Sequence, residues 1–139
     1  MAKHNEIGQR GEQLAADYLI QKGYTVLDRN WRYGRAEMDI IAKDGATLVF
    51  AEVKTRSDDH FERPESAVDE KKRRLLARAA VAYMREIGHD WAIRFDILAV
   101  ILRGDAFFID HFEDAFFPAI SGLIALKMPF STHRWNGIF

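Results

Sequence analysis

Asp39, Glu52 and Lys54 bring two carboxylates and an amine together around one turn of the chain. The step from Asp44 to Gly45 between two apolar runs is typical of a β-hairpin, and side chains alternate between the two faces of a strand. Asp39, Glu52 and Lys54 are therefore predicted to project from one face of that hairpin. Carboxylate oxygens suit Mg²⁺ or Mn²⁺, and a nearby lysine can stabilise an attacking water or the charge that develops in phosphoryl transfer.

The expected register places the two acids diagonally across the hairpin. With residues 43–46 in the turn, Ala42 lies opposite Thr47. Asp39 then lies opposite Phe50, and Glu52 is diagonal to Asp39. The other face of the hairpin is expected to hold Met38, Ile40, Val49, Ala51 and Val53.

An alternative interpretation makes these acids solvated charges on an exposed strand face. The same face, however, also holds Ile41, Leu48 and Phe50, so both faces are apolar along the middle of the hairpin. That pattern favours central strands, in which charges are unfavourable unless they are paired or bind a metal. Both interpretations stay open on the pattern alone.

A third acid, Glu12, lies on a helix predicted over residues 5–22, which Gly23 ends. Glu12 shares a helical stripe with Ala15, Ala16 and Leu19, and this stripe is expected to pack on the sheet. The alternative is an acid placed favourably near the helix start by the helix dipole. Together, Glu12, Asp39, Glu52 and Lys54 form a coherent set for binding a hard cation.

The elements that must position this set follow from the hydrophobic pattern. A strand is predicted at 24–31, a turn at 33–35, and the hairpin strands at 38–42 and 47–53. After a polar stretch at 55–63 come a helix at 65–87 and strands at 92–101 and 106–109. This order indicates a mixed sheet with helices packed on it, an α/β or α+β domain. Residues 118–139, basic and aromatic without an acid, are interpreted as an arm or tail.

Composition restricts the class of protein. The chain has 139 residues, no cysteine, 48% hydrophobic residues and a formal net charge of −1, which fits one globular domain and excludes a disordered chain or a disulfide scaffold. Without a long apolar segment or a signal peptide, no membrane partner and a cytoplasmic location are expected. The histidines do not have the spacing of metal ligands, and the sequence contains no nucleophile elbow, phosphate-binding loop or dinucleotide-binding motif. Neither zinc nor a nucleotide cofactor is therefore expected.

The spacing of Asp39, Glu52 and Lys54 resembles that of the PD-(D/E)xK nuclease superfamily. The surrounding sequence resembles, over roughly residues 6–117, the YraN-like family of predicted endonucleases. The segments that carry this resemblance are RGEQLAADYLIQKGY, RNWR, AEMDIIA, LVFAEVKTR, AVDEKKRRLLARAA and RFDILAV. The family fold is similar to that of archaeal Holliday junction resolvases. The resemblance implies an α/β, restriction-endonuclease-like, mixed five-stranded sheet flanked by helices in a nuclease-like domain at 1–117, followed by an extension at 118–139.

The resemblance also implies roles for individual residues. Asp39 and Glu52 would hold Mg²⁺ or Mn²⁺ with the Val53 carbonyl, Lys54 would assist the water, and Glu12 would complete the acidic set. Glu37 also matches the family pattern. It follows Ala36, where a glycine is usual, and an acid at a strand start is the alternative reading.

Asp96 is a further match to the family. It lies in the segment RFDI, close to Arg94. A structural ion pair between Arg94 and Asp96 is equally consistent with the sequence.

The second predicted helix is locally basic. Lys72 shares a stripe with Leu75 and Leu76 that is expected to face the sheet, whereas a solvated helix face is the common explanation for such charge runs. The candidate contacts to DNA phosphates are Lys71, Lys72, Arg73, Arg74 and Arg78.

These features lead to one favoured function and two alternatives. The favoured function is a Mg²⁺-dependent endonuclease that hydrolyses phosphodiester bonds in DNA, with branched or otherwise structured DNA as the expected substrate. One alternative is a non-catalytic DNA-binding module on a nuclease-like scaffold. Another is an interaction protein that docks through its aromatic tail. A homodimer is implied only by analogy with resolvases.

Overall fold

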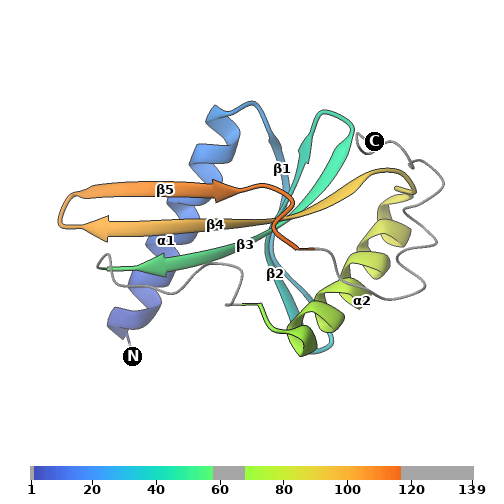
Figure 1. Ribbon diagram of the computed structural model, residues 1–139, viewed down its shortest axis with the longest axis horizontal. Helices are drawn as coiled ribbons and strands as arrows, with labels where there is room; N and C mark the ends of the chain where they lie inside the picture. Colours follow the sequence, from blue (N-terminus) through green and yellow to red (C-terminus); the bar gives the residue numbers. More distant parts are fainter. Residues whose placement is uncertain (1, 58–67, 117–139) are drawn as a thin grey trace.

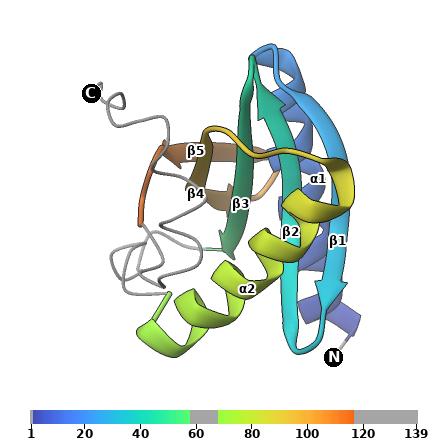
Figure 2. The same ribbon diagram turned by 90° about the vertical axis from the view of Figure 1, so that its right-hand side faces the viewer.

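A five-stranded mixed β-sheet forms the centre of the protein, with one helix on each face (Figures 1 and 2). The structure is a computed structural model that describes residues 2–57 and 68–116. Its elements are α1 (Ala2–Gln21), β1 (Thr25–Tyr33), β2 (Ala36–Asp44), β3 (Thr47–Arg56), α2 (Glu70–Ile87), β4 (Ile93–Arg103) and β5 (Ala106–Phe112). None of the helices in these residues is both long and apolar enough to cross a membrane.

The strands lie side by side in chain order. β3 and β4 are parallel, and every other neighbouring pair is antiparallel. Parallel neighbours need a crossover connection, and α2 lies in that connection (Figure 1). This confirms the predicted α/β architecture, a mixed five-stranded sheet flanked by helices, which is consistent with a restriction-endonuclease-like fold.

β3 is buried on both faces of the sheet. Leu48 and Phe50 pack in the cluster beneath α2, and Val49 and Ala51 pack in the cluster beneath α1. Because β3 lies between β2 and β4, it is a central strand, as the apolar pattern on both faces of the hairpin predicts.

Helix α1 approaches β3 very closely at Gly11. A Cβ atom on Gly11 would lie 1.9 Å from Oγ1 of Thr55, so only glycine fits at this contact. The predicted apolar stripe continues along the helix, where Ala15 and Leu19 are fully buried. Glu12 directly follows Gly11, so this tight packing fixes Glu12 relative to the end of β3.

Each predicted helix and strand differs from the structure at one boundary or both, and two of these differences have a clear physical cause. Helix α2 begins at Glu70 and not near residue 65, because Asp69 has extended backbone and accepts a hydrogen bond from the backbone N–H of Lys72. Strand β3 continues through Thr55 and Arg56, which the sequence analysis placed in the polar stretch after the strand, because both residues pair with β4.

Three sequence predictions concern residues outside the described ranges. These are the helical assignment of 65–67, the polar stretch at 58–63 and the extension at 118–139. The division of the chain at residue 117 therefore stays a prediction.

The hairpin turn is shorter than the predicted one. Gly45 and Ala46 alone form it, with Gly45 at φ 61°, and Asp44 pairs with Thr47. The predicted pairing of Ala42 with Thr47, and of Asp39 with Phe50, is therefore wrong. The error amounts to two positions along β3, which leaves every β3 side chain on its predicted face.

The alternation of side chains breaks in β2 at Asp39. Met38 packs in the cluster beneath α2, whereas Ile40 packs in the cluster beneath α1. Residues two apart on a regular strand share a face, so the predicted common face for Met38 and Ile40 is wrong. The last paired residues of β2 and β3 are Ile40 and Ala51, so the break coincides with the end of their pairing.

We predict that Gly11→Ala destabilises the fold whereas Gly8→Ala does not. The added methyl at Gly11 would overlap Thr55, and overpacking costs about 1–3 kcal/mol. At Gly8 a Cβ atom meets nothing within 4 Å, and alanine there raises helix propensity by up to about 1 kcal/mol. Urea denaturation of both variants checks this; equal stabilities would show that α1 can move away from β3 without loss.

Candidate active site

Asp39 and Glu52 lie where the pairing of β2 with β3 ends. Beyond the last pair, Ile40 and Ala51, the next residue on each strand is one of these acids. The Asp39 carboxylate accepts a hydrogen bond of 2.8 Å from the backbone N–H of Val53. A side chain thus ties the two strands together where their backbone ladder has stopped, and it holds Asp39 beside the residue that follows Glu52.

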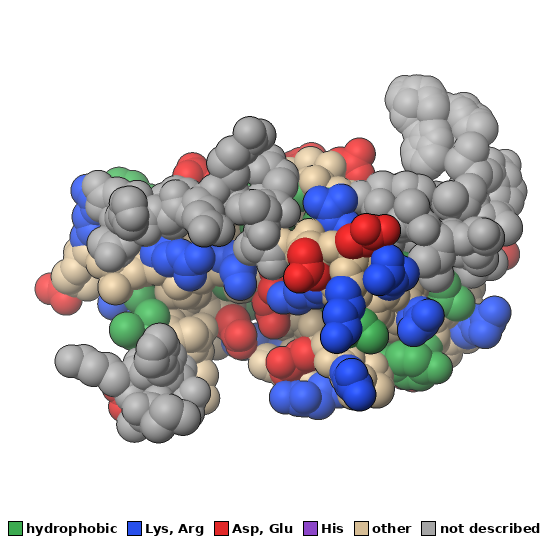
Figure 3. Space-filling model, turned by 60° about the horizontal axis from the view of Figure 1, so that its bottom comes forward, with side chains coloured by type: hydrophobic (Ala, Val, Ile, Leu, Met, Phe, Trp, Pro, Cys, Tyr) green, Lys and Arg blue, Asp and Glu red, His purple; other side chains and the backbone are tan. Residues whose placement is uncertain are grey.

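The Asp39 carboxylate is difficult to ionise in this position. Burial, together with the negative charges of Glu52 and Glu12, raises the pKa of Asp39 to about 7, although the Val53 N–H and the Lys72 ammonium act to lower it. Such a raised pKa arises when acids share a partly buried place, and it is common at catalytic and metal-binding sites. Figure 3 shows acidic side chains near the middle of one face of the molecule, with Lys and Arg side chains on either side.

Lys72 brings a positive charge from α2 to Glu52. Its Nζ lies 2.5 Å from Oε2 of Glu52, whose side chain is 9% exposed. Asp69 caps α2 by accepting from the Lys72 N–H, so Lys72 stands in the first turn of the helix. The prediction that Lys72 faces the sheet is confirmed.

Glu12 reaches the same region from α1, on the other face of the sheet. Asn30 of β1 donates a hydrogen bond of 3.2 Å from its side-chain amide to Oε1 of Glu12. Burial raises the pKa of Glu12, as do the charges of Glu37 and Glu52, whereas Arg29 lowers it. Glu12, Asp39 and Glu52 therefore interact electrostatically although they come from three elements.

Sequence reasoning missed Asn30. Its φ of 53° lies in the left-handed region, which asparagine tolerates better than other side chains. Asparagine is uncommon within strands, so its presence here was the one sequence signal of an irregular backbone. That irregularity lets the Asn30 side chain reach Glu12 on α1.

Lys54 and Glu12 border one open cavity of about 230 Å³ at the end of β3. Lys54 is two residues beyond Glu52 on β3 and is partly buried. The cavity is lined by Ile7, Gly8, Glu12, Val53, Lys54, Thr55 and Arg56. Lys54, the lysine of the predicted set, thus borders the same open cavity as one of the predicted acids.

The acids do not form a closed metal cage. Within residues 2–57 and 68–116, no group of three His, Cys, Asp or Glu side chains is arranged to hold a metal ion. The arrangement offers a pair of carboxylates, Asp39 and Glu52, with Glu12 near enough to affect the pKa of Asp39. An ion bound there would need water or substrate oxygens to complete its coordination.

A family model described as "Uncharacterised protein family UPF0102" matches residues 11–100 of the chain. The chain belongs to the UPF0102 family. This is the YraN-like family to which the sequence motifs point, so that resemblance is confirmed. The matched range contains every predicted site residue, from Glu12 to Asp96.

Similar UPF0102 proteins cover most of the chain. A UPF0102 protein of Phocaeicola vulgatus is 45% identical over 120 residues, which cover 86% of this chain and 99% of the relative. A UPF0102 protein of Bacteroides thetaiotaomicron is 48% identical over 120 residues, with the same coverage of both chains. One of Christiangramia forsetii is 48% identical over 117 residues, which cover 84% of this chain and 98% of the relative.

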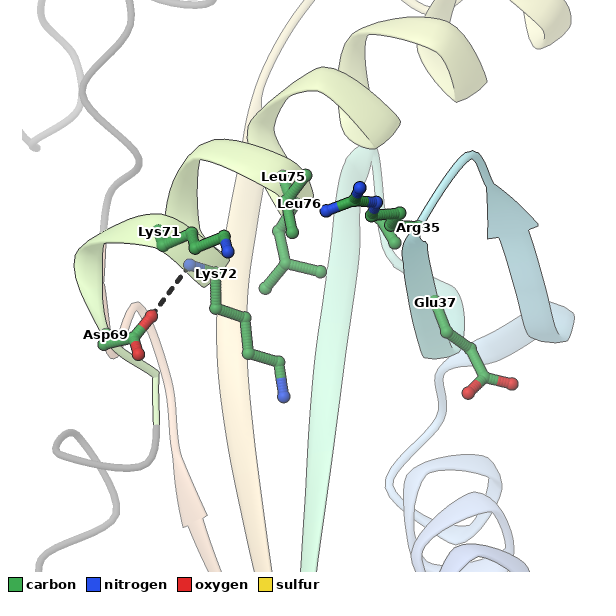
Figure 4. Close-up of a pocket in the computed structure, with 8 residues that line it drawn as sticks. Arg35, Glu37, Asp69, Lys71, Lys72, Leu75 and Leu76 are labelled. Carbon is green, nitrogen blue, oxygen red and sulfur yellow. Dashed lines mark hydrogen bonds between the residues drawn. The ribbon is translucent and has the colours of Figure 1, made fainter.

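Glu37, which the family resemblance also implied, lies on β2 two residues before Asp39. It forms an ion pair of 3.6 Å with Arg32 and borders a second cavity of about 300 Å³, between α2 and the start of β2 (Figure 4). The preceding Ala36 is buried in the core and is absent from the described residues with positive φ. Alanine in place of the usual family glycine therefore requires no left-handed backbone.

Asp96 lies apart from this site, on the face of the sheet that α1 covers. It is completely buried and accepts hydrogen bonds from Arg94, from His111 Nε2 at 2.7 Å and from the backbone N–H of Asp114. Although burial opposes ionisation, the bonds from His111 and Arg94 lower the pKa of Asp96. Both carboxylate oxygens of Asp96 are therefore engaged by protein donors. This is the structural ion pair with Arg94 that the sequence analysis gave as the alternative.

The basic residues of α2 have different surroundings. Arg73 donates to the Val68 carbonyl and lies over the ring of Phe116, so its guanidinium is engaged by the protein. Arg74 pairs with Glu70 at 3.1 Å on an exposed surface. Lys71 and Arg78 are exposed, which leaves them accessible to a ligand.

We predict that the metal-free protein loses stability as the pH rises from about 4 to about 7, and that Asp39→Asn reduces this loss. Folding raises the pKa of Asp39 from 3.8 to about 7, so in this window the folded chain holds a proton that the unfolded chain has released. The stabilisation is complete below the unfolded pKa and lost as the pH rises through the folded one. The difference between the two proteins amounts to up to about 4 kcal/mol.

Urea denaturation in EDTA at several pH values measures this difference. Asparagine retains an oxygen that can accept from the Val53 N–H, so the variant is expected to fold. Parallel pH profiles of wild type and Asp39→Asn would contradict the raised pKa.

Proposed function

We propose that this protein is a metal-dependent endonuclease that hydrolyses phosphodiester bonds in DNA. The observation that carries the proposal is the meeting of Asp39 and Glu52 at the end of the β2–β3 pairing, with Lys54 two residues further along β3. Carboxylates on adjacent strands beside a lysine form an arrangement suited to phosphoryl transfer. Glu12 and Lys72 add charges from the two helices.

The donor set fits Mg²⁺ or Mn²⁺. Mg²⁺ is usually held by one or two carboxylates and keeps several waters or phosphate oxygens, so Asp39 and Glu52 suffice without a third protein ligand, and Glu12 could bind through water. Burial, and after it the negative charges of Glu52 and Glu12, raise the pKa of Asp39 to about 7, and a bound cation would favour the ionised carboxylate. When bound, the metal would make water a better nucleophile and neutralise charge on the phosphate.

The chain's own residues would divide the remaining work. Asp39, held by the Val53 N–H, keeps one carboxylate oxygen outside that hydrogen bond. Lys54 would hold the attacking water and stabilise negative charge on the phosphate. Glu12 borders the same cavity as Lys54 and would orient solvent there.

The DNA surface is proposed to include the start of α2. Lys71 and Arg78 are exposed, and Arg74 has only an exposed partner. In a chain with net charge −1, attraction to phosphates must come from such a local surface. Branched or otherwise structured DNA remains the expected substrate, with a cytoplasmic location and a homodimer as parts of the same proposal.

We predict that Glu52→Gln and Asp39→Asn each abolish cleavage that depends on Mg²⁺ or Mn²⁺. Both changes retain side-chain volume and remove an anionic metal ligand. Nicking of supercoiled plasmid and cutting of four-way and flapped DNA measure activity, and thermal melting verifies the fold. Glu86→Gln, at an exposed acid near the end of α2, is the matched control and is expected to cut like wild type.

Two outcomes contradict this prediction. Glu52→Gln that cuts as fast as wild type would place the active site elsewhere. DNA binding by wild type without cleavage in either metal would favour the non-catalytic module.

A second prediction concerns Lys54→Ala, which is expected to slow cleavage by about 10²-fold or more and leave metal binding intact. The magnitude is typical of losing one group that acts in the transition state. Single-turnover rates and calorimetric Mn²⁺ titration separate the two effects. Lys43→Ala, at the opposite end of β2 with its amine over Trp91, is the control, and weakened Mn²⁺ binding in Lys54→Ala would instead make Lys54 part of the metal site.

A further inference from the structure

The cavity between α2 and the start of β2 has an apolar wall and a basic rim. Ala36 and Leu76 are buried in its wall, and Leu75 is partly buried beside them. Arg35 and Lys71 stand at its edge, both exposed. Figure 4 shows Arg35 reaching toward α2 across this space, and Lys72 extending from the helix toward the strands. The volume of about 300 Å³ is at the small end of ligand sites, which suits one nucleoside.

The cations at the rim are available for a ligand. Among the described residues, neither Arg35 nor Lys71 has an acidic partner within ion-pair distance. The two acids at the cavity are engaged, because Asp69 caps α2 and Glu37 pairs with Arg32. With three cations, Arg35, Lys71 and Lys72, and two carboxylates, Glu37 and Asp69, the lining has a formal excess of one positive charge, which favours an anionic ligand such as a phosphate.

An exposed aromatic ring stands beside this rim. Tyr33 pairs across the β1–β2 hairpin with Ala36, so the two side chains share a face of the sheet and Tyr33 adjoins the cavity wall. Tyr33 is 51% exposed. Its ring lies parallel to Trp31, with centroids 6.2 Å apart, and Trp31 in turn packs edge-on against Tyr83 of α2. Tyr33 is thus a supported ring that faces solvent.

We infer that this cavity and the ring of Tyr33 bind an unpaired nucleotide of the DNA strand next to the bond that is cut. This inference rests on the proposed nuclease function. Nucleobases stack on exposed aromatic rings, and basic side chains follow the backbone of single strands. The apolar wall of Leu75 and Leu76 then covers the sugar or base, and Arg35 and Lys71 contact the flanking phosphates.

The site selects unpaired nucleotides because of its shape. A base inside a duplex is covered on both faces by its neighbours and cannot lie against Tyr33 or enter a cavity of this size. Junctions, flaps and single-stranded ends contain bases that can.

The cavity also adjoins the acid pair. Lys72 lines the cavity, and its Nζ contacts Glu52. Glu37 lines it as well, and its charge raises the pKa of Glu12. A nucleotide bound here would leave its neighbouring phosphate close to Asp39 and Glu52.

The test measures binding in protein that cannot cut. In a Glu52→Gln background, fluorescence anisotropy gives the affinity for a labelled single strand, a flapped duplex and a blunt duplex. Tyr33→Ala is expected to weaken binding of the first two by about 5- to 150-fold, the range for losing one stacked base, and to change blunt-duplex binding less than about twofold. Tyr33→Phe is expected to bind like the parent.

Matched controls separate stacking from general effects. Phe108→Ala removes a ring of similar exposure, 53%, on β5, and is expected to leave all three affinities unchanged. In a series of flapped duplexes, each with one abasic nucleotide at a different position, the loss of affinity caused by Tyr33→Ala is expected to disappear at one position only. That position is the nucleotide whose base stacks on Tyr33.

The outcomes distinguish this inference from the proposed function. Equal losses for Tyr33→Ala on single-stranded, flapped and blunt DNA, or no loss, would overturn the inference even if wild type cuts DNA. A selective loss in a protein that never cuts DNA would support the nucleotide site and refute the nuclease.

Discussion

Everything at this site depends on holding negative charges together in a partly buried place. Asp39 and Glu52 occupy adjacent strands, and Glu12 is near enough to raise the pKa of Asp39. Like charges in such surroundings repel and lose hydration, so the fold must compensate for them. It does so with the Val53 N–H at Asp39, the Lys72 ammonium at Glu52 and the Asn30 amide at Glu12. Each acid thus has one neighbour from a different element.

Those elements are positioned by ordinary packing. The approach of Gly11 to Thr55 sets α1 against β3, the Asp69 cap starts α2 where Lys72 can reach the sheet, and the end of the β2–β3 ladder brings the two strand acids together. Helix capping, helix packing and strand pairing therefore position the acids. The repulsion between the acids is offset by only a few groups, the Val53 N–H, the Lys72 ammonium and the Asn30 amide.

Much of this arrangement was predictable from sequence because periodicity reports which face a side chain takes. The common face of Leu48, Phe50 and Glu52, and the direction of Lys72, follow from strand and helix periods. Periodicity could not give the break at Asp39, since that depends on where two strands separate in space. The length of the hairpin turn could not be predicted either, because an Asp-Gly pair is compatible with loops of two or of four residues. Asn30 was missed because its backbone conformation has meaning only once α1 is in place.

Lys72 lines the cavity and contacts Glu52, so it would take part in both the proposed nucleotide site and the proposed metal site. A ligand that draws the ammonium away from Glu52 leaves that carboxylate free for a cation. A cation that binds Glu52 releases the ammonium toward the cavity. Thermodynamic linkage requires the two effects to be equal: whatever factor the nucleotide adds to metal affinity, the metal adds to nucleotide affinity. Under the proposed function, one lysine would thereby make occupancy of the two sites cooperative, without any movement of the sheet.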